Sequence, residues 1–542
     1  MTGKNTGFKI VLLEKFFKEK FAWYGLLFFI SSAVFLFFQI KTRYFYGFDS
    51  YYHAKMGVFM MENGPFTKEF PWMYFTFQRE HFVNPFFLFH LYLGVWQKVF
   101  VFNTLMGCKV AMAALMGLCF VWSARVSERA GKLGAVIGVL FLFSVLTPDV
   151  YIRLLLVRSH VLSLFLLVAG IDAFFRKRWL VAGILAMAYT YSYVAFFLFP
   201  VVIITGAVFM SIDEKKVVWK PAVYVLSGML AGVLINPSFP HNVEYLYNNL
   251  FRMALTNSPL AGMEWLPIST RDFITRYWYV LALMFGSVVT VFLNRMKYSW
   301  KCVFLFSIAC FFMAMTMYSK RFIEYWPFMV SLAVSFIFIE TIQMYNARRA
   351  VKNAIIAIVG VCLFCYGTFE MVRSYREARS IIPMAELSEV MTVLDKKAEP
   401  GDIVYSEDWE MFSPMFYLCD KVYYLQGLDP GMMRLAHPGL FALWQGINTG
   451  AIQGDVYPAV REIYRRSLDP ETGAVKYAME TGKTGRDIPH VIREVFKSRW
   501  ILLTHGHYGE TYDMRPLLAK YPDQIELIAG NKYFSLYKVK DI

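Results

Sequence analysis

The sequence predicts a polytopic α-helical membrane domain followed by an extracytoplasmic α/β domain. Three features lead to this prediction: an apolar composition, a series of long apolar stretches up to residue 370, and a polar C-terminal region with alternating helix and strand patterns. Of the 542 residues, 57% are hydrophobic and 18% are charged, whereas soluble proteins average roughly 45–50% and about 25%. This composition excludes a disordered chain, a coiled coil and an ordinary cytosolic enzyme.

The apolar stretches predict the membrane spans. The first, at 21–40, follows a basic amphipathic N-terminus and reaches the length of about 20 residues that a bilayer requires. No small-residue cleavage site follows it, so we expect an anchor and not a removed signal peptide. With the later stretches the predicted spans number about eleven. The later ones lie at 104–124, 133–148, 161–175, 179–193, 194–211, 218–235, 277–294, 301–317, 324–345 and 353–370. A shorter apolar stretch at 85–100 predicts an interfacial helix.

The positions of the basic residues predict the topology. With a cytoplasmic N-terminus, the short loops that face the cytoplasm are all basic, as the positive-inside rule requires. These loops contain Arg125, Arg129 and Lys132; Arg176, Lys177 and Arg178; Lys215, Lys216 and Lys220; Arg295, Lys297 and Lys301; and Arg348, Arg349 and Lys352. The net charge of +15 therefore reflects mainly topology and secondarily contact with anionic membrane lipids. We expect no nucleic-acid partner and a location in the cell (inner) membrane.

The same topology places three loops outside, at 41–103, 149–160 and 236–276, together with the C-terminal region. We predict a transmembrane catalytic domain over 1–370, with 41–103 as its long first outer loop, and a soluble α/β domain over 371–542. In the latter, REARSIIPMAELSEVMTVLDKKA predicts a helix, and GDIVYSEDW and KVYYLQGLDP predict strands. HVIREVFKSRWILLTH predicts a helix leading into a strand, and IELIAGNKYFSLYKV predicts a hairpin.

The first outer loop begins with a candidate functional helix. If Asp49 to Asn63 is helical, Asp49, His53 and Met56 share one face just past the first span. Ionisable residues at a membrane boundary are costly unless they are used or solvated. The alternative is that Asp49 is the N-cap of this helix, because Asp is favoured there. The two roles do not exclude each other.

The second outer loop contains arginines and a histidine at the start of an apolar span. Arginine recognises phosphate with two parallel hydrogen bonds, and histidine donates to phosphate or binds metal. We interpret Arg158 and His160 as functional, and Arg153 as a cation that reaches to the interface, which is common at span ends.

The third outer loop and a later span supply further candidates. Glu264 and Trp265 lie in an otherwise uncharged stretch, and Arg321 and Glu324 lie at the outer start of a span. A simple salt bridge between Arg321 and Glu324 at helical spacing is the alternative for that pair. The sequence has no Walker loop, Rossmann glycine motif, zinc signature or nucleophile elbow.

This pattern resembles the GT-C superfamily of membrane glycosyltransferases, and within it the catalytic subunit of oligosaccharyltransferases. The first outer loop begins DSYYH at Asp49 and ends ENG. GMEWLP, with Glu264, is similar to the glutamate that precedes an x-x-P segment in that family. Arg321 is similar to the family's arginine at the outer start of a late span. EDWEMFSP, over Glu407–Pro414, weakly resembles its acceptor-recognition motif. The resemblance implies a polyprenyl-linked donor and an extracytoplasmic acceptor.

One departure concerns the metal site of that family. Its second outer loop carries two carboxylates that bind a divalent metal with the first-loop aspartate, but the matching positions here are near His160 and Leu162. If Mn²⁺ or Mg²⁺ is used, the resemblance leaves Asp49, Glu264 and His160 as ligands. We favour the alternative, in which arginines neutralise the donor phosphate without a metal.

The resulting hypothesis is a glycosyltransferase that transfers a sugar or oligosaccharide from a polyprenyl phosphate or diphosphate to an extracytoplasmic protein, lipid or polysaccharide. Asp49 and Glu264 are its catalytic residues. The donor phosphate is bound by Arg158, His160 and Arg321. The acceptor is bound by His53, Trp265, Asp408 and Trp409.

The alternative hypothesis is a non-enzymatic transporter, flippase or envelope-assembly protein. Transporters place ionisable or helix-breaking residues near the midplane of the bilayer, often in repeated halves. Here the polar residues concentrate in outer loops and no internal repeat is visible, so the enzyme is favoured.

The predicted topology can be tested with reporter fusions. A reporter fused after residue 375 should be active outside the cytoplasm, and one fused near Lys297 should be active inside. Reversed signals would contradict the site assignment, because that assignment requires the three outer loops to share one side of the membrane.

Overall fold

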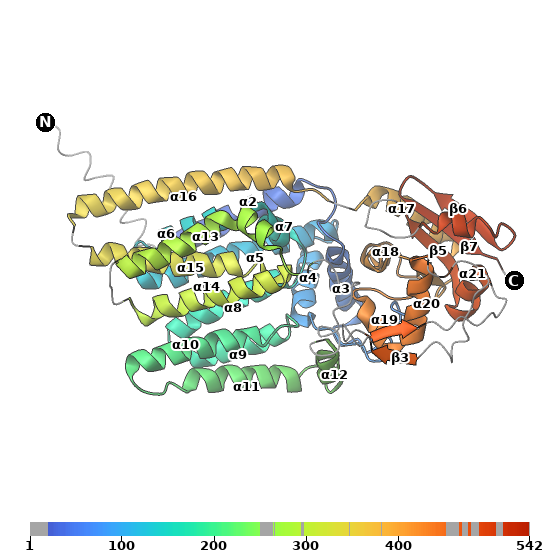
Figure 1. The fold of residues 1–542 in the computed structure, drawn as a ribbon, viewed down its shortest axis with the longest axis horizontal. Coiled ribbons are helices and arrows are strands. Elements are labelled where there is room, and N and C mark those ends of the chain that lie inside the picture. Colours follow the sequence, from blue (N-terminus) through green and yellow to red (C-terminus); the bar gives the residue numbers. More distant parts are fainter. Residues whose placement is uncertain are drawn as a thin grey trace. The chain divides into compact units, whose positions relative to one another are not determined.

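The computed structural model describes residues 20–249, 264, 266–293, 298–345, 347–380, 382–450, 452, 465–468, 475–478, 487–505 and 513–540. The chain forms two compact units (Figure 1). The helical unit contains Met1–Tyr46, Pro85–Phe239 and Met263–Arg379. The α/β unit contains Gly47–Asn84, Pro240–Gly262 and Ser380–Ile542. The α/β unit thus takes up parts of the first and third predicted outer loops in addition to the C-terminal region.

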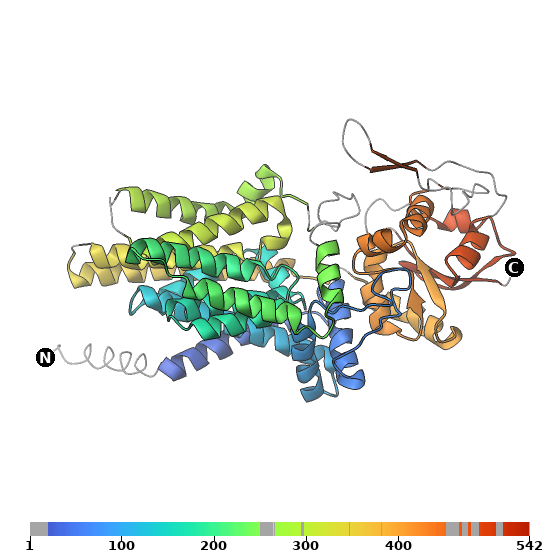
Figure 2. The same ribbon diagram turned by 90° about the horizontal axis from the view of Figure 1, so that it is seen from below.

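The helical unit is a bundle whose long helices run side by side in two perpendicular views (Figures 1 and 2). Its helices are α2 (Lys20–Ile40), α4 (Phe87–Val99), α5 (Thr104–Ser127), α6 (Gly134–Val145), α7 (Pro148–Leu155), α8 (His160–Phe175), α9 (Trp179–Thr190), α10 (Leu198–Glu214), α11 (Lys220–Leu234), α13 (Thr270–Leu293), α14 (Trp300–Tyr318), α15 (Trp326–Met344) and α16 (Arg349–Glu377). Short helical turns are η1 (Glu128–Ala130) and η4 (Lys320–Phe322). Every stretch predicted as a span contains a helix, and α4 occupies the stretch predicted as an interfacial helix.

Helix length gives a smaller count of spans than the sequence did. Among the described residues, six helices are long and apolar enough to cross a membrane: α2, α5, α13, α14, α15 and α16. Helices α6 and α7 together make a seventh candidate that is bent by 98°. Helices α8, α9 and α11 are apolar but shorter. The predicted count of about eleven is therefore not confirmed and stays a prediction.

Burial distinguishes the centre of the bundle from its lipid-facing periphery. In the apolar windows of the spans, 72% of α5 is buried inside the protein, but only 17% of α16. Exposed apolar side chains such as Phe364 on α16 match a surface that faces hydrocarbon. Small residues allow close helix contacts: a Cβ atom on Gly228 of α11 would collide with the backbone carbonyl of Gly183 on α9.

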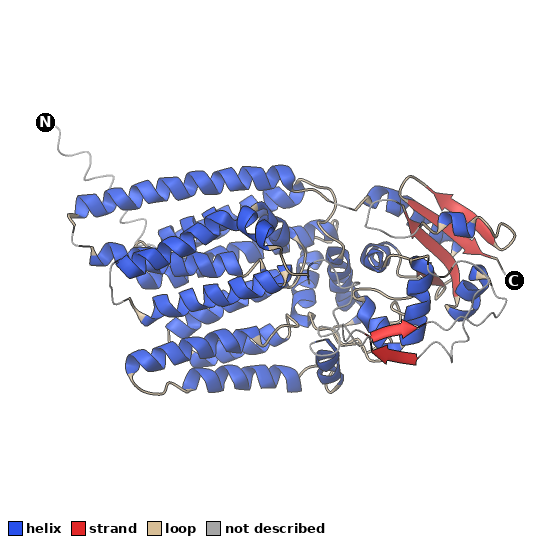
Figure 3. Cartoon of the chain, viewed as in Figure 1, coloured by secondary structure: helices blue, strands red, loops and turns tan. Residues whose placement is uncertain are grey.

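The α/β unit contains a five-stranded sheet with helices around it (Figure 3). The strand order is β2-β1-β5-β7-β6, from β1 (Ile403–Ser406), β2 (Tyr423–Tyr424), β5 (Ser498–Thr504), β6 (Ile525–Gly530) and β7 (Phe534–Val539). Strand β1 pairs in parallel with β2 and β5, whereas β7 pairs antiparallel with β5 and β6. The strands predicted from the C-terminal sequence are all present.

The remaining elements of this unit are helical, apart from a separate antiparallel pair. The pair is β3 (Arg465–Leu468) and β4 (Val475–Ala478). The helices are α3 (Asp49–Asn63), α12 (His241–Tyr247), α17 (Met384–Lys397), α18 (Phe412–Leu418), α19 (Pro430–Ala436), α20 (Pro438–Asn448), α21 (Ile488–His490) and α22 (Arg515–Leu518), with the turns η5 (Trp409–Met411) and η6 (Val491–Val495).

The first outer loop extends the edge of the sheet beyond β2. Met73 forms a parallel bridge with Tyr424. The amide of Tyr74 donates to the carbonyl of Tyr424 at 2.8 Å, and the amide of Phe75 donates to the carbonyl of Leu425 at 2.9 Å. Hydrogen bonding to the loop covers an edge that would otherwise present unpaired backbone groups. This explains why Gly47–Asn84 of the first loop belongs to the α/β unit, which the sequence pattern did not predict.

A buried carboxyl group at the end of β1 makes the stability of the α/β unit pH-dependent. Glu407 is only 5% exposed, its Oε1 accepts from the hydroxyl of Thr504 at 2.8 Å, and burial raises its pKa from 4.5 to about 8. From about pH 5 to 8 the folded protein retains this proton and the unfolded chain releases it, so stability falls as pH rises.

We therefore expect Glu407→Gln to flatten the pH dependence of unfolding, because an amide does not titrate. For the wild type, the free energy of unfolding should fall by up to roughly 1.4 kcal/mol per pH unit. Thermal unfolding of the purified protein between about pH 5 and 8 measures this. Glu526→Gln, at an exposed position of β6, is the matched control and should retain the wild-type profile. Parallel profiles for Glu407→Gln and the wild type would contradict the assignment.

Candidate functional site

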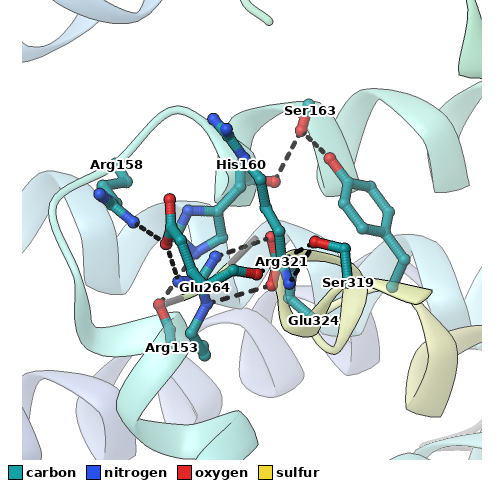
Figure 4. A network of polar contacts seen from close by, with 9 residues as sticks. Arg153, Arg158, His160, Ser163, Glu264, Ser319, Arg321 and Glu324 are labelled. Carbon is teal, nitrogen blue, oxygen red and sulfur yellow. Dashed lines mark hydrogen bonds and ion pairs between the residues drawn. The ribbon is translucent and has the colours of Figure 1, made fainter. Parts of the chain in front are cut away.

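The candidate site is a cluster of arginines and glutamates in the helical unit (Figure 4). It is built from α7, the start of α8, Glu264, and the segment Ser319–Glu324 that precedes α15. Pro148 lies in the first turn of α7, where its fixed φ is favourable and its missing N–H costs nothing. The 98° bend between α6 and α7 turns α7 out of the direction of the span and lets it contribute side chains to the cluster.

Arg153 lies at the centre of the cluster. Its Nη1 contacts Oε2 of Glu264 at 2.6 Å, and its Nε contacts Oε2 of Glu324 at 3.2 Å. Its Nη2 also donates to Oε1 of Glu324 at 3.4 Å. The Arg153 side chain is only 16% exposed. The interpretation of Arg153 as a cation that reaches to the interface was therefore wrong, because two acidic partners hold it inside the protein.

Glu264 receives a second arginine. Arg158 Nη1 contacts the same Oε2 at 2.7 Å, and the hydroxyl of Ser319 donates to the Glu264 backbone carbonyl at 3.0 Å. Burial alone would raise the pKa of the Glu264 carboxyl, but Arg158, Arg153 and Arg321 hold that pKa well below its usual range. Glu264 is therefore a carboxylate that accepts hydrogen bonds from two guanidinium groups.

Glu324 pairs with Arg153 and not with its sequence neighbour Arg321. The Glu324 side chain is fully buried, and a buried carboxylate needs a compensating partner. The simple Arg321–Glu324 salt bridge that helical spacing suggested is replaced by the contact with α7. Arg321 is placed by its backbone, whose amide donates to the hydroxyl of Ser319 at 3.4 Å, and its side chain extends past His160 (Figure 4).

His160 is the first residue of α8 and is 3% exposed. Its Nε2 lies 2.8 Å from the backbone carbonyl of Arg153, so this ring nitrogen carries a proton and donates to that carbonyl. One turn later, the hydroxyl of Ser163 contacts the phenol of Tyr325. His160 thus connects the start of α8 to the end of α7, and it adds no negative charge to the cluster.

The cluster has a surplus of positive charge. Among the residues that the structure describes, three guanidinium groups, those of Arg153, Arg158 and Arg321, face two carboxylates, those of Glu264 and Glu324. Arg158 remains 21% exposed. A site with more guanidinium groups than carboxylates favours the binding of an anion. The planar guanidinium of arginine matches the geometry of phosphate oxygens.

The same residues do not fit a divalent metal ion. The contacting oxygen of Glu264 is already shared by Arg153 and Arg158, and the His160 nitrogen is used by a carbonyl. Neighbouring guanidinium charges also repel a second cation. In the part of the chain that the structure describes, no group of three or more His, Cys, Asp or Glu side chains is arranged to hold a metal.

The other predicted site residues belong to the α/β unit or are not described. Asp49 and His53 are on α3 of the α/β unit, where His53 is 4% exposed and burial lowers its pKa to about 3. Phe48, not Asp49, occupies the N-cap of α3, and no side-chain cap hydrogen bond forms. The N-cap interpretation of Asp49 is therefore not supported. Trp265 lies outside the described residues.

Asp408 and Trp409 follow β1 in the α/β unit. The Asp408 side chain caps η5 by accepting from the amide of Glu410 at 2.9 Å, and burial raises its pKa to about 6. Trp409 packs against the core of the unit. Both residues thus have structural roles in addition to the acceptor-binding role predicted for them.

No protein-family model and no characterised protein matches the sequence, but solved structures share its fold. The oligosaccharyltransferase of Archaeoglobus fulgidus in the apo form aligns with a TM-score of 0.58 at 11% identity, over 95% of this chain and 88% of that one. The same enzyme tethered to an acceptor peptide containing the NVT sequon aligns with a TM-score of 0.55 at 11% identity, over 90% and 70%.

ArnT from Cupriavidus metallidurans, bound to undecaprenyl phosphate, aligns with a TM-score of 0.56 at 11% identity, over 95% of this chain and 97% of that one. Two different membrane glycosyltransferases thus match almost the whole chain in three dimensions, although their sequences have diverged. The likeness extends across the helical and the α/β parts. The chain therefore has the GT-C fold that the sequence resemblance predicted.

Proposed function

We propose that this protein is a GT-C-type membrane glycosyltransferase that uses a polyprenyl phosphate or diphosphate donor on the extracytoplasmic side. The single observation that carries the proposal is the convergence of three partly buried arginines, Arg153, Arg158 and Arg321, on two glutamates among the described residues, at the ends of apolar helices. Such a site suits a donor whose phosphate lies at the membrane surface while its isoprenoid chain stays in hydrocarbon. The likeness to ArnT, solved with undecaprenyl phosphate, supports this donor class.

In this mechanism the acceptor nucleophile attacks the anomeric carbon of the sugar. The bond between that carbon and the phosphate oxygen breaks, and its electron pair remains on the departing phosphate. Arg158 and Arg321 stabilise the charge that develops there, as preorganised donors do in other transferases. Asp49 takes the proton of the acceptor as general base. Arg153 is a positioning residue, because its guanidinium is already used by Glu264 and Glu324.

Glu264 has a different role from the one that a metal ligand would have. Its two arginine contacts orient the forks of Arg153 and Arg158, so it preorganises the cation side of the site. The acceptor class stays open: the tethered peptide in the archaeal enzyme is consistent with a protein acceptor, and lipid or polysaccharide remain the alternatives. His53, Asp408 and Trp409 remain the proposed acceptor-binding residues among the described part of the chain.

Arg158→Lys tests how the phosphate is bound. Lysine keeps the charge but loses the planar fork, and a lost charge-assisted hydrogen bond costs about 1.5–3 kcal/mol. We expect a roughly ten- to hundredfold lower transfer rate, measured as sugar release from polyprenyl-linked donors in isolated membranes.

Arg276→Lys is the matched control for this experiment, because Arg276 pairs with Asp149 while 57% exposed, and it should stay near the wild-type rate. Chelation with EDTA should have little effect on the wild type. Complete inactivation by EDTA that Mn²⁺ or Mg²⁺ reverses would refute the arginine mode.

Asp49→Asn tests the general base. The substitution keeps the size of the side chain and removes its charge, so we expect near-complete loss of transfer with normal expression and folding. Transfer in membranes and the thermal midpoint of the purified variant measure the two effects. Asp420→Asn, at a 48% exposed position of the same unit, should remain active. An Asp49→Asn variant that keeps most of its activity would assign Asp49 a structural role only.

A further inference from the structure

A second group of arginines lies at the opposite end of α8 from His160. Asp172 follows His160 by twelve residues, which is about 18 Å along a helix. The Asp172 side chain is almost completely buried, with 3% exposure. It accepts contacts from three arginines, which belong to α5, to η1 and to the residue that ends α8: Arg125, Arg129 and Arg176. We call these three residues the Asp172 arginine cluster.

The distances show that one carboxylate organises the whole cluster. Arg176 Nε lies 2.7 Å from Oδ1 of Asp172, Arg125 Nη2 lies 3.0 Å from Oδ2, and Arg129 Nε lies 4.0 Å from Oδ1. The three arginine side chains are between 24% and 32% exposed. They are therefore held in place from inside the protein while part of each side chain still reaches the surface.

The cluster has more hydrogen-bond donors than its acids can use. Each guanidinium carries about five N–H donors, whereas a carboxylate accepts at roughly four positions. Arg125 Nε is buried and has no hydrogen-bond partner in the described structure. The neighbouring acid Glu128 accepts from the phenol of Tyr24 at 2.8 Å. Lys301 is a further cation near the cluster. Its Nζ lies 5.6 Å from the ring centre of Phe175, which directly precedes Arg176 in the chain.

The cluster lies at the end of an apolar span, beside residues that are typical of the membrane–water interface. The apolar span that contains α5 runs over Thr104–Ala130 and ends among these arginines. The guanidinium of Arg125 lies 4.8 Å from the ring centre of Trp122, and Tyr24 is close by through Glu128. Tryptophan and tyrosine mark the membrane–water interface. The positive-inside rule predicts that this end of the bundle faces the cytoplasm.

We propose that the Asp172 arginine cluster binds the phosphodiester head group of an anionic membrane lipid. Phosphodiester oxygens match the planar forks of arginine, and basic pockets between spans at the cytoplasmic surface are suited to anionic head groups. This site is separate from the proposed donor site, which lies at the other end of α8. Topology alone requires only positive charge in these two loops, not three arginine side chains that converge on one buried carboxylate.

Lipid titration of the purified protein in neutral detergent tests this site. Native mass spectrometry should show that phosphatidylglycerol binds more tightly than phosphatidylcholine. Arg129→Gln should lower the affinity for phosphatidylglycerol about fivefold, as expected for the loss of one arginine near a membrane surface. Arg129 is chosen because it makes the longest contact with Asp172. The double variant Arg348→Gln with Arg349→Gln removes exposed cations from another basic loop and should keep wild-type affinity.

Several results would overturn the proposal. Equal weakening by Arg129→Gln and by the double variant would show general attraction of anionic lipid to basic loops. Competition by inorganic phosphate at the lipid's own concentration would show a site for a soluble anion.

Should Arg129→Gln lower the thermal midpoint, Arg129→Lys replaces it, because it keeps the charge and loses only the fork. Unchanged phosphatidylglycerol affinity in Arg129→Lys would then also count against the site.

Discussion

The candidate site depends on one guanidinium group, that of Arg153. It contacts Glu264 and Glu324, which are 111 and 171 positions away in the sequence. Through these contacts α7, the end of the third outer loop and the segment before α15 meet at one point. Removing one partner of a buried ion pair typically costs about 3–5 kcal/mol, because it leaves an uncompensated charge. Glu324, which is fully buried, would be that charge if Arg153 were lost.

The arginines of the candidate site differ in how they contact the glutamates. Arg153 contacts both Glu264 and Glu324, whereas Arg158 contacts Glu264 with its side chain 21% exposed. The helical unit thus contains arginines at both ends of α8, and each group is arranged around buried acid. In both places the acid holds the arginine side chains in position, and this preorganisation would reduce the ordering cost of the anion binding that we propose. The two groups differ in where the acid lies. The acids that contact Arg153 come from two other segments of the chain, whereas Asp172 is part of α8 itself.

Much of the fold was predictable because its signals are local. Apolar runs predicted helices at every expected span, and turn residues around Gly530 and Asn531 predicted the hairpin of β6 and β7. Two features were missed for a common reason. Residues 73–75 pair with the edge of the sheet beside β2, more than 300 positions later in the chain, and Arg153 pairs with Glu324 in place of Arg321. Neither pairing has a counterpart in the periodicity of its own segment.

The sequence by itself determined which stretches of the chain form apolar helices, that the C-terminal region forms an α/β unit, and that Arg158, Glu264 and Arg321 are unusual charges next to apolar segments. Hydrophobicity and periodicity act over one or two turns of chain, so they can be read without a structure. Only the tertiary structure decided which acid neutralises which arginine and that Arg153 is the central residue. Helix packing brings these side chains together, and a buried carboxylate takes the cation that packing places within hydrogen-bond distance, whatever its position in the sequence.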